Sequence, residues 1–338
     1  MKLQNDTDRV ELADLPRIPG LRARHLQEAV DYGRLAEVMG AANAFDSIPW
    51  LPTGENLQVE YEGNDGIDPR RDLVLAEVDD RLVAFSGVER TVRDGVATYN
   101  VSGWVHPEHR RRGLGTCLLA WNLRRAAARA ASEPPGMPVA AQAFADEGEA
   151  GHRALLAGAG FEPARHFFLM QRARLDDVPA APLPDGIEVR PVTPDQHRTI
   201  FDAESEAFLD HWGSHEWGDD RFRTTFAKSE LDTSLWVVAW DGDQVAGVVE
   251  NWVWPDENRK LGVKRAWLER ISVRRPWRRR GLGRAITAAS LVRLREAGLD
   301  EAMLGVDSEN PNGALGLYES LGFAVYLRAA AYRRPITF

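Results

Sequence analysis

The sequence predicts an α/β protein that contains two copies of one domain. Its 338 residues exceed the length at which a single hydrophobic core usually stops growing, which favours two cores of roughly 150 residues each. Two stretches also resemble each other, WVHPEHRRRGLGTCLLAWNLRRA from Trp104 and SVRRPWRRRGLGRAITAASLVRL from Ser272. Further along, AGAGF and ESLGF recur in the same order and end at Phe161 and Phe323. This self-similarity predicts a duplicated domain.

A proline-rich segment separates the two copies. RLDDVPAAPLPDG has three prolines, which interrupt both helical and strand periodicity. Strand-like segments at 21–25 and 187–191 follow the expected arm and linker. We expect an arm at residues 1–16, a first domain at 17–173, a linker at 174–186 and a second domain at 187–338.

The second copy alternates strand and helix patterns. An Asp-Gly-Asp turn at 241–243 between two apolar runs predicts a hairpin. After the Arg/Gly loop, apolar residues at i, i+3, i+4 and i+7 predict a helix that packs on the sheet. The expected order is strands at 235–239, 245–249 and 267–273, a helix from 282 to the stop at Gly298, a strand at 301–306, a helix at 314–321 and a strand at 323–327.

The first copy repeats the apolar stripe of that helix. The stripe consists of Leu114, Cys117, Leu118 and Trp121. We therefore interpret Cys117 as a packing residue of the core and not as an acyl-carrying nucleophile. As the only cysteine, it excludes an intrachain disulfide framework and a multi-cysteine zinc site, and we expect no metal.

Composition narrows the classes of function. The net charge of -9 argues against nucleic-acid binding. The N-terminus lacks the pattern of a signal peptide, and no apolar run is long enough for a membrane span. We therefore expect a cytoplasmic protein without a nucleic-acid or membrane partner. The sequence does not indicate an oligomeric state.

The RRRGLG loop between a strand and a helix has the features of a pyrophosphate site. Free amides and the positive end of the helix dipole meet there, and glycines allow a ligand to approach the backbone. A Rossmann turn would need a third glycine where Leu118 and Ile286 stand, and no GxxxxGK[ST] motif occurs. A basic surface turn capped by glycine is the alternative, which the duplication disfavours.

The order of these motifs resembles the GNAT superfamily of N-acetyltransferases. The second copy has Arg278, Gly281 and Gly283, followed by Asn310, Ala314, Tyr318 and the Gly322-Phe323 pair. The resemblance covers most of both halves, and AAAYRRP at the end is similar to tandem members of the mycothiol synthase group. Strand WLERISV departs from that group, so its substrate is not carried over. The family implies two domains, each with a mixed, mostly antiparallel twisted sheet flanked by helices.

The resemblance also implies an acetyl-CoA site between the fourth and fifth strands of the second copy. The thioester would lie at the amide of Val273 and the pyrophosphate at the amides of residues 279–284. The residues expected at this site are Ile271, Val273, Arg278, Arg279, Arg280, Gly281, Leu282, Gly283, Arg284 and Asn310. An equivalent loop in the first copy is a possible second CoA site, with Val105, Arg110, Arg111, Arg112, Gly113 and Gly115.

Two residues of the second copy are candidates for acid and base catalysis. Tyr318 matches the family's general acid, which supplies a proton to the departing thiolate. Glu269 lies four residues before Val273 and would share its face on a regular strand, so it could accept the proton of the amine. Glu250 on the preceding strand is a rival for the base, and a chain of water molecules is another.

The first copy lacks both groups. Leu156 stands five residues before Phe161, where the second copy has Tyr318, and Val101 stands where the second copy has Glu269. His152 could replace the acid, but a surface or capping histidine is the more frequent case. We expect the first copy to be catalytically degenerate.

The expected function is transfer of an acetyl group from acetyl-CoA to a primary amine of a small molecule or peptide. The acidic, aromatic segment 209–222 and the tryptophans Trp252, Trp254 and Trp267 could form a wall for a cationic amine, or they could fill the core. An inactive acyl-CoA sensor or scaffold is the main alternative, and Tyr318 argues against it. An interaction protein built on the duplicated sheet would not need the glycine pairs.

Overall fold

The computed structural model describes residues 10, 12, 15–93, 95–212, 217–310 and 313–337. The chain folds into two compact units. Unit 1 contains residues 1–164 and 330–338, and unit 2 contains residues 165–329. The division therefore lies within two strands, β6 (Glu162–Arg172) and β12 (Ala324–Pro335), whose residues are shared between the units. The boundaries between the units, at residues 164/165 and 329/330, therefore differ from the expected linker at 174–186.

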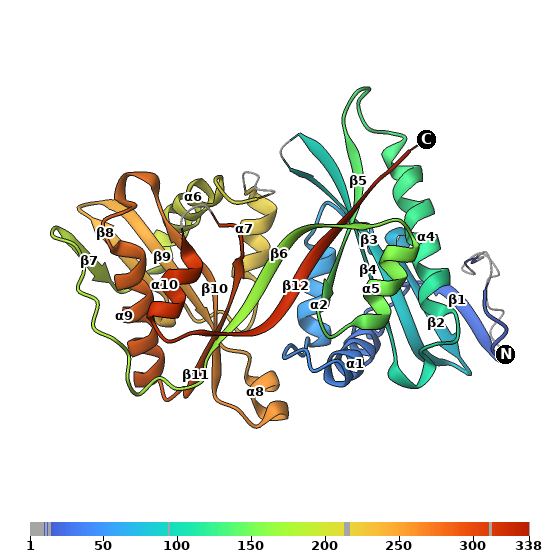
Figure 1. Cartoon of the computed structure of the whole chain (residues 1–338), viewed down its shortest axis with the longest axis horizontal. Helices are drawn as coiled ribbons and strands as arrows, with labels where there is room; N and C mark the ends of the chain where they lie inside the picture. The colour runs from blue at the N-terminus through green and yellow to red at the C-terminus, as the bar shows by residue number, and fades with distance from the viewer. Residues whose placement is uncertain are drawn as a thin grey trace. The chain divides into compact units, whose positions relative to one another are not determined.

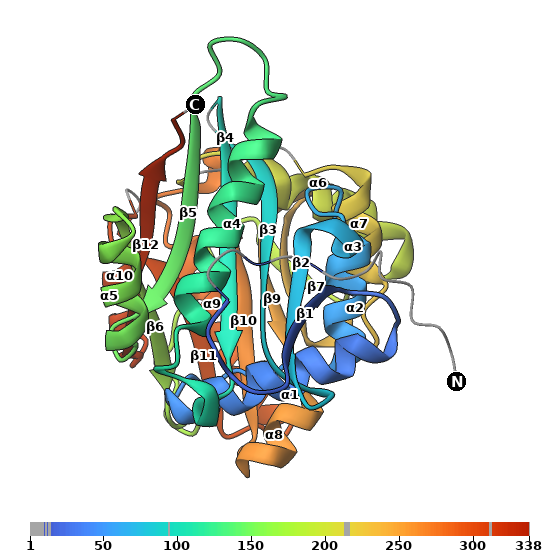
Figure 2. The same ribbon diagram turned by 90° about the vertical axis from the view of Figure 1, so that its right-hand side faces the viewer.

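Unit 1 is a mixed sheet with helices on both faces. Its strands are β1 (Leu21–His25), β2 (Leu73–Val78), β3 (Arg81–Arg93), β4 (Val96–Val105) and β5 (Val139–Asp146), followed in the sheet by the end of β12. Its helices are α1 (Val30–Phe45), α2 (Gly54–Glu62), α3 (Pro69–Asp72), α4 (Leu114–Ala130) and α5 (Ala150–Gly158). Figure 2 shows α4 crossing in front of β3 and β4. One hydrophobic cluster lies under α4 and α5, and another under α1 and α2.

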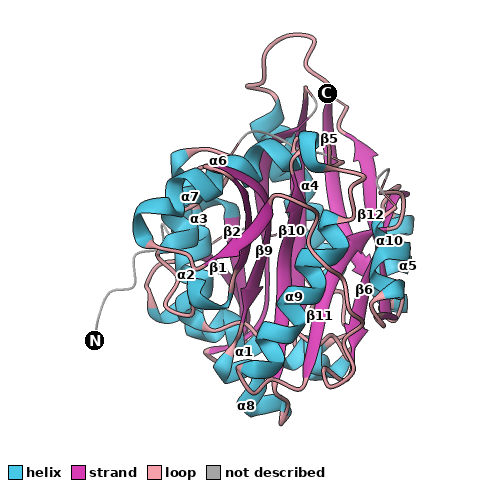
Figure 3. Cartoon of the chain, turned by 90° about the vertical axis from the view of Figure 1, so that its left-hand side faces the viewer, coloured by secondary structure: helices cyan, strands magenta, loops and turns pink. Residues whose placement is uncertain are grey.

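Unit 2 repeats this arrangement. Its sheet has the order β12, β6, β11 (Glu301–Asp307), β10 (Arg265–Val273), β9 (Gln244–Trp252), β8 (Val237–Asp241) and β7 (Ile187–Arg190). Its helices are α6 (His197–Phe208), α7 (Asp219–Phe226), α8 (Pro255–Leu261), α9 (Leu282–Glu296) and α10 (Ala314–Ser320). Cores under α9 and α10 and under α6 and α7 cover the two faces. Figure 1 labels the elements, and Figure 3 shows α9 in front of the strands of unit 2.

The expected α/β class, with mixed and mostly antiparallel sheets, is confirmed. β4 with β5 and β10 with β11 pair in parallel, whereas β1 with β2, β2 with β3, β3 with β4, β7 with β8, β8 with β9, β9 with β10 and β6 with β11 are antiparallel. The hairpin at 241–243 and the helix from Leu282 form as expected. Cys117 is also confirmed as a core residue, because it is 4% exposed and lies among the apolar side chains of α4. Among the described residues, no helix has the length and apolar character that a membrane crossing needs.

Candidate functional site

The Arg/Gly loop of unit 2 presents an open backbone cradle. Gly281 is the N-cap of α9 with a φ of 81°, and Arg279 has a φ of 60°, so the loop has two residues in the left-handed region. A Cβ atom at Gly281 would meet no atom within 4 Å. Arg279, Arg280 and Gly281 are exposed. The first helical amides have no partner inside the helix, so they are free to bind an anion.

The side chain of Arg278 connects this loop to β10 and to the end of α6. Its Nε donates to the carbonyl oxygen of Val273 at 2.8 Å, and its guanidinium bonds to the carbonyl oxygen of Ala207 and to the Asp210 carboxylate. Hydrogen bonds from Arg275 and Arg278 hold the pKa of Asp210 well below its usual range. The side chain of Arg278 thus anchors the loop to the end of α6, which leaves the backbone of the loop and Arg279 and Arg280 to face a ligand.

The two strands next to the loop, β10 and β11, separate toward the loop. β10 pairs with β11 only over Arg265 to Trp267, opposite Glu301 to Met303, although both strands continue beyond these residues. Backbone groups of β10 beyond Trp267 are therefore not paired to β11. Ile271 and Val273 lie in this separated part of the strand, half-buried. Leu282 is buried, and Gly283 packs toward Val273 and Leu317.

A β-bulge interrupts β10 at Glu269. Leu268 pairs with Asn251 and Arg270 with Glu250, so Glu269 is the extra residue. Side-chain alternation is broken at this point, and the spacing of four residues no longer places Glu269 and Val273 on one face. Glu269 is exposed. The sequence carries no signal for one inserted residue in a strand, which is why the alternation from Glu269 was expected to continue.

Tyr318 lies at the edge of the unit 2 core. It is on α10, 7% exposed, and its ring packs edge to face on Phe323 with centroids 6.1 Å apart. Burial raises its pKa above the usual value, so the phenol stays protonated and can donate at neutral pH. Asn310 lies in the segment before α10. Its backbone N–H donates to the carbonyl oxygen of Asp307, and its backbone carbonyl accepts from the N–H of Gly313.

Arg284, also expected at the CoA site, lies partly over α10. Its Nε is 3.4 Å from the Ser320 hydroxyl, and its guanidinium donates to the carbonyl oxygen of Ala180 at 3.2 Å. The side chain is therefore tied to the surface of unit 2. The backbone amide of Arg284, which belongs to the first turn of α9, remains the group expected to bind an anion.

A buried charged cluster lies on the α6 face of the same sheet. Glu204 of α6 is 0% exposed, Glu250 of β9 is 1% exposed, and Arg270 of β10 makes an ion pair with Glu250. The Nε atom of Arg270 is 3.9 Å from a Glu204 oxygen. Burial and the charge of Glu250 raise the pKa of Glu204 well above its ordinary value. Glu250 was the rival base in the sequence, whereas Glu204 was missed because only the fold brings α6 against these strands.

Unit 1 has the same loop in the same conformation. Arg111 has a φ of 63° and Gly113 a φ of 90°, and Arg110 bonds to the Val105 carbonyl and in bidentate fashion to Asp46. Arg111, Arg112 and Gly113 are exposed, as are their counterparts in unit 2. A Cβ atom at Gly113 would lie 3.4 Å from Pro16, and one at Gly115 would lie 3.4 Å from Leu155. The expected arm thus reaches the first loop, in contrast to the open space at Gly281.

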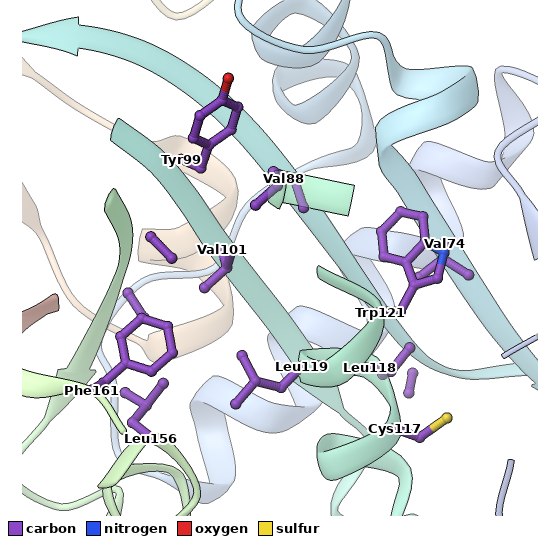
Figure 4. Close-up of a cluster of buried hydrophobic side chains, with 14 of the residues drawn as sticks. Val74, Val88, Tyr99, Val101, Cys117, Leu118, Leu119, Trp121, Leu156 and Phe161 are labelled. Atoms are coloured by element: carbon purple, nitrogen blue, oxygen red, sulfur yellow. The ribbon is translucent and has the colours of Figure 1, made fainter. Parts of the chain in front are cut away.

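In unit 1, an apolar core residue, Leu156, stands at the position that corresponds to Tyr318. Leu156 is 1% exposed, and Figure 4 shows it beside Phe161 within the buried cluster that includes Val101 and Leu119. His152 is half-buried on α5, with its Nδ1 3.4 Å from Glu149. β4 pairs with β3 in an unbroken register from Ala84 to Arg93, without a bulge.

The tryptophans of unit 2 belong mainly to the core under α6 and α7. Trp252 is 4% exposed and stacks on Trp254 with centroids 5.4 Å apart, and Trp267 packs on the same cluster. The indole of Trp267 donates to Glu257 at 2.9 Å. Of the acidic segment 209–222, residues 213–216 lie outside the described residues.

Comparison with known proteins identifies the family. The model of the acetyltransferase (GNAT) family matches residues 198–323, and the model of the acetyltransferase (GNAT) domain matches residues 69–162. The chain belongs to the GNAT family of acetyltransferases. This N-acetyltransferase therefore contains two GNAT domains in tandem, as the repeat predicted.

Curated relatives and solved structures match nearly the whole length of the chain. A mycothiol acetyltransferase of Thermobispora bispora is 32% identical, over 91% of this chain and 96% of that protein. A mycothiol acetyltransferase of Salinispora arenicola is 30% identical, over 91% and 93%. A GCN5-related N-acetyltransferase from Sphaerobacter thermophilus superposes with a TM-score of 0.71 at 26% identity, covering 96% of this chain and 98% of its own. A tandem GNAT protein from the clavulanic acid biosynthesis pathway gives a TM-score of 0.65 at 19% identity, over 94% and 99%.

Proposed function

We propose that this GNAT protein transfers the acetyl group of acetyl-CoA directly to a primary amine in a ternary complex, and that the reaction takes place in unit 2. The main support for placing the reaction in unit 2 is that Tyr318 stands where unit 1 has Leu156. The two loops have the same backbone conformation and the same arginine anchor, but only unit 2 has a hydroxyl group at the matched position.

Acetyl-CoA fits the loop of unit 2 because the space over Gly281 is open and the first amides of α9 lack helical partners. The amides of residues 279–284 would hold the pyrophosphate, with Arg279 and Arg280 beside it. The backbone of Ile271 and Val273, in the separated part of β10, would face the thioester. Acetyl-CoA supplies an activated acetyl group on a good leaving thiolate.

Two protons move during acetyl transfer: one leaves the amine and one is added to the thiolate. A C–N bond forms between the acetyl carbon and the neutral amine, and the C–S bond breaks. Tyr318 donates a proton to the thiolate, since its pKa keeps the phenol protonated until that moment. Glu269, exposed at the bulge, is the proposed acceptor of the amine proton, directly or through water. Glu250 is less suited to contact an amine because it is 1% exposed.

The proposed acceptor is the amine of a small molecule. Two relatives that span nine-tenths of the chain are named mycothiol acetyltransferase. The unacetylated amine form of mycothiol is therefore the first acceptor to assay, followed by amino sugars, polyamines and peptide N-termini. In the sequence, the acidic segment 209–222 favours a cationic acceptor.

Replacement of Tyr318 by phenylalanine tests the assignment. Tyr318→Phe keeps the ring and its packing, so acetyl-CoA affinity by calorimetry should be unchanged. Positioned acids typically contribute about 10² to 10⁴ in rate, and water can replace part of this for a thiolate. We therefore expect the turnover number to fall about tenfold or more. Tyr332→Phe is the matched control, because Tyr332 is buried to the same degree in unit 1 and should tolerate the change.

Three results would count against the proposal. Unchanged turnover in Tyr318→Phe would remove the acid from the mechanism. Loss of turnover in an intact Gly113→Val protein would move the chemistry to unit 1. Acetyl-CoA binding without turnover of any amine in the panel would favour the inactive sensor.

A further inference from the structure

The Glu204–Glu250–Arg270 cluster buries three ionisable side chains, and removing such groups from water costs folding free energy. Three charged side chains from α6, β9 and β10 meet in a largely buried site. Neither oxygen of Glu204 has a hydrogen-bond partner within the described part of the chain. Unpaired buried carboxylates are strongly disfavoured, so the arrangement calls for a physical explanation.

The surroundings of Glu204 favour a proton on its carboxyl group. Burial and the charge of Glu250 raise its pKa, and these effects outweigh the charges of Arg270 and of Arg221 of α7, which lower it. The Trp217 ring contacts both arginines, and its centroid lies 5.2 Å from the guanidinium carbon of Arg270 and 4.0 Å from that of Arg221. A proton on one of the two carboxyl groups removes the repulsion between two like charges in this low-dielectric site.

Glu204 is the residue that holds this proton. Glu250 already has the ion pair with Arg270 and accepts a hydrogen bond from the indole of Trp252 at 3.3 Å. Glu204 is fully buried, and its ion-pair distance to the Arg270 Nε is a long 3.9 Å. A protonated Glu204 has an O–H group that can donate to Glu250.

The cluster is attached to the strand that the proposed reaction uses. Arg270 follows the bulge residue directly and is the point where β10 resumes its register against β9, opposite Glu250. Ile271 and Val273, which would face the thioester, come next in the strand. When the side chain of Arg270 is held in place, it fixes the end of the bulge. It thereby fixes the direction of the backbone N–H groups of residues 271–273.

Unit 1 supports the link between the cluster and the bulge. Arg270 lies three residues before Val273, and Ser102 lies three residues before Val105. Ser102 pairs with Gly87, so two small neutral residues stand where unit 2 has Arg270 and Glu250. The β4 register is unbroken at the same place. The bulge and the charged pair are thus present together in unit 2 and absent together from unit 1.

We propose that Glu204 and Glu250 are positioning residues which, through Arg270, hold the bulged part of β10 in the geometry that binds the acetyl thioester, and that this requires one proton on the carboxylate pair. The inference rests on the proposed function of unit 2. Loss of the proton places two negative carboxylates together in the buried site, and their mutual repulsion favours entry of water around Arg270.

The test compares two ligands that differ at the thioester. Acetyl-CoA and desulfo-CoA share the nucleotide and pyrophosphate, but only acetyl-CoA has the carbonyl group that the β10 amides would bind. Calorimetry at pH 6.0 and pH 8.5 measures the ratio of their affinities. One hydrogen bond changes an affinity by about twofold to tenfold. We expect the preference for acetyl-CoA to decrease by about threefold between these pH values in the unmodified protein.

Variants connect the pH effect to the cluster. Glu204→Gln is neutral at every pH and can donate to Glu250, so it should keep the preference at pH 8.5. Arg270→Met should reduce the preference at both pH values, with desulfo-CoA affinity retained. Asp202→Asn is the matched control on α6, where Asp202 is exposed and pairs with Arg198, and it should behave as the unmodified protein does.

The outcomes separate this inference from the proposed function. An equal pH dependence in Glu204→Gln and in the unmodified protein would overturn the inference, as would a preference unaffected by Arg270→Met. If the unmodified protein bound neither ligand, the proposed function itself would fail. The pH dependence of the unmodified protein provides a readout that does not depend on the folding of any variant.

Discussion

Replacement of Glu204 by glutamine should change how the stability of the protein depends on pH. Burial and the charge of Glu250 raise the pKa of Glu204 above its ordinary value of 4.5 in the folded state. Between the unfolded and the folded pKa, the folded protein keeps a proton that the unfolded chain releases. The free energy of unfolding therefore decreases as the pH rises through this window.

The magnitude follows from linkage. Each pH unit inside the window removes about 1.4 kcal/mol from the free energy of unfolding for one group. Glu204→Gln carries no titrating proton, so this loss is absent from the variant. We compare the two proteins by subtracting the unfolding free energy of the unmodified protein from that of the variant. This difference should increase by about 1.4 kcal/mol for each pH unit above 4.5 that lies inside the window.

Urea unfolding at half-unit pH intervals measures this difference. Other titrating groups are common to both proteins, so their contributions largely cancel in the comparison. Asp202→Asn serves as the exposed control on the same helix and should show a difference that stays nearly constant. A constant difference in Glu204→Gln as well would mean that Glu204 titrates normally and that the cluster does not hold a proton.

The other predictions concern the two loops. Gly281→Val strains a residue with a φ of 81° and occupies the open cradle, so acetyl-CoA affinity should fall about tenfold or more, whereas Gly113→Val, with a comparable φ of 90°, should leave it unchanged. Calorimetry should give one acetyl-CoA per chain because Pro16 lies against Gly113, and a stoichiometry of two would assign a second site to the first loop. Leu156→Tyr should destabilise the protein by about 1 to 3 kcal/mol through overpacking, without gain of activity.

Local features of the site could be predicted from the sequence. The left-handed conformation of Gly113 and Gly281 follows from glycine at a turn into a helix, and both signals lie within RRRGLG. The left-handed conformation of Arg111 and Arg279 has no such signal. The apolar stripe of α9 fixes which face of that helix is buried. Cys117 follows by the same periodicity in α4. These inferences hold because their physical causes act over one or two helical turns.

Features that depend on distant residues could not be predicted in this way. The bulge adds one residue to β10, and nothing in WLERISV marks Glu269 as that residue. Glu204 reads in the sequence as one of several acidic residues of an amphipathic helix, and only tertiary packing places it beside Glu250 and Arg270. The end of β12 joins the sheet of unit 1 for the same reason, because strand pairing is decided by partners far along the chain.

The two units together show which feature carries functional information. The Arg/Gly loop is equally well formed in both, down to the arginine that bonds to the last carbonyl of the preceding strand. A feature that both copies keep can serve the fold alone, since Arg110 and Arg278 each connect the loop to the end of a helix. The bulge, the buried cluster and the phenol of Tyr318 are found in unit 2, and none of the three is needed to build the sheet of unit 1. Because all three features distinguish unit 2 from unit 1, they support the proposal that the chemistry takes place in unit 2.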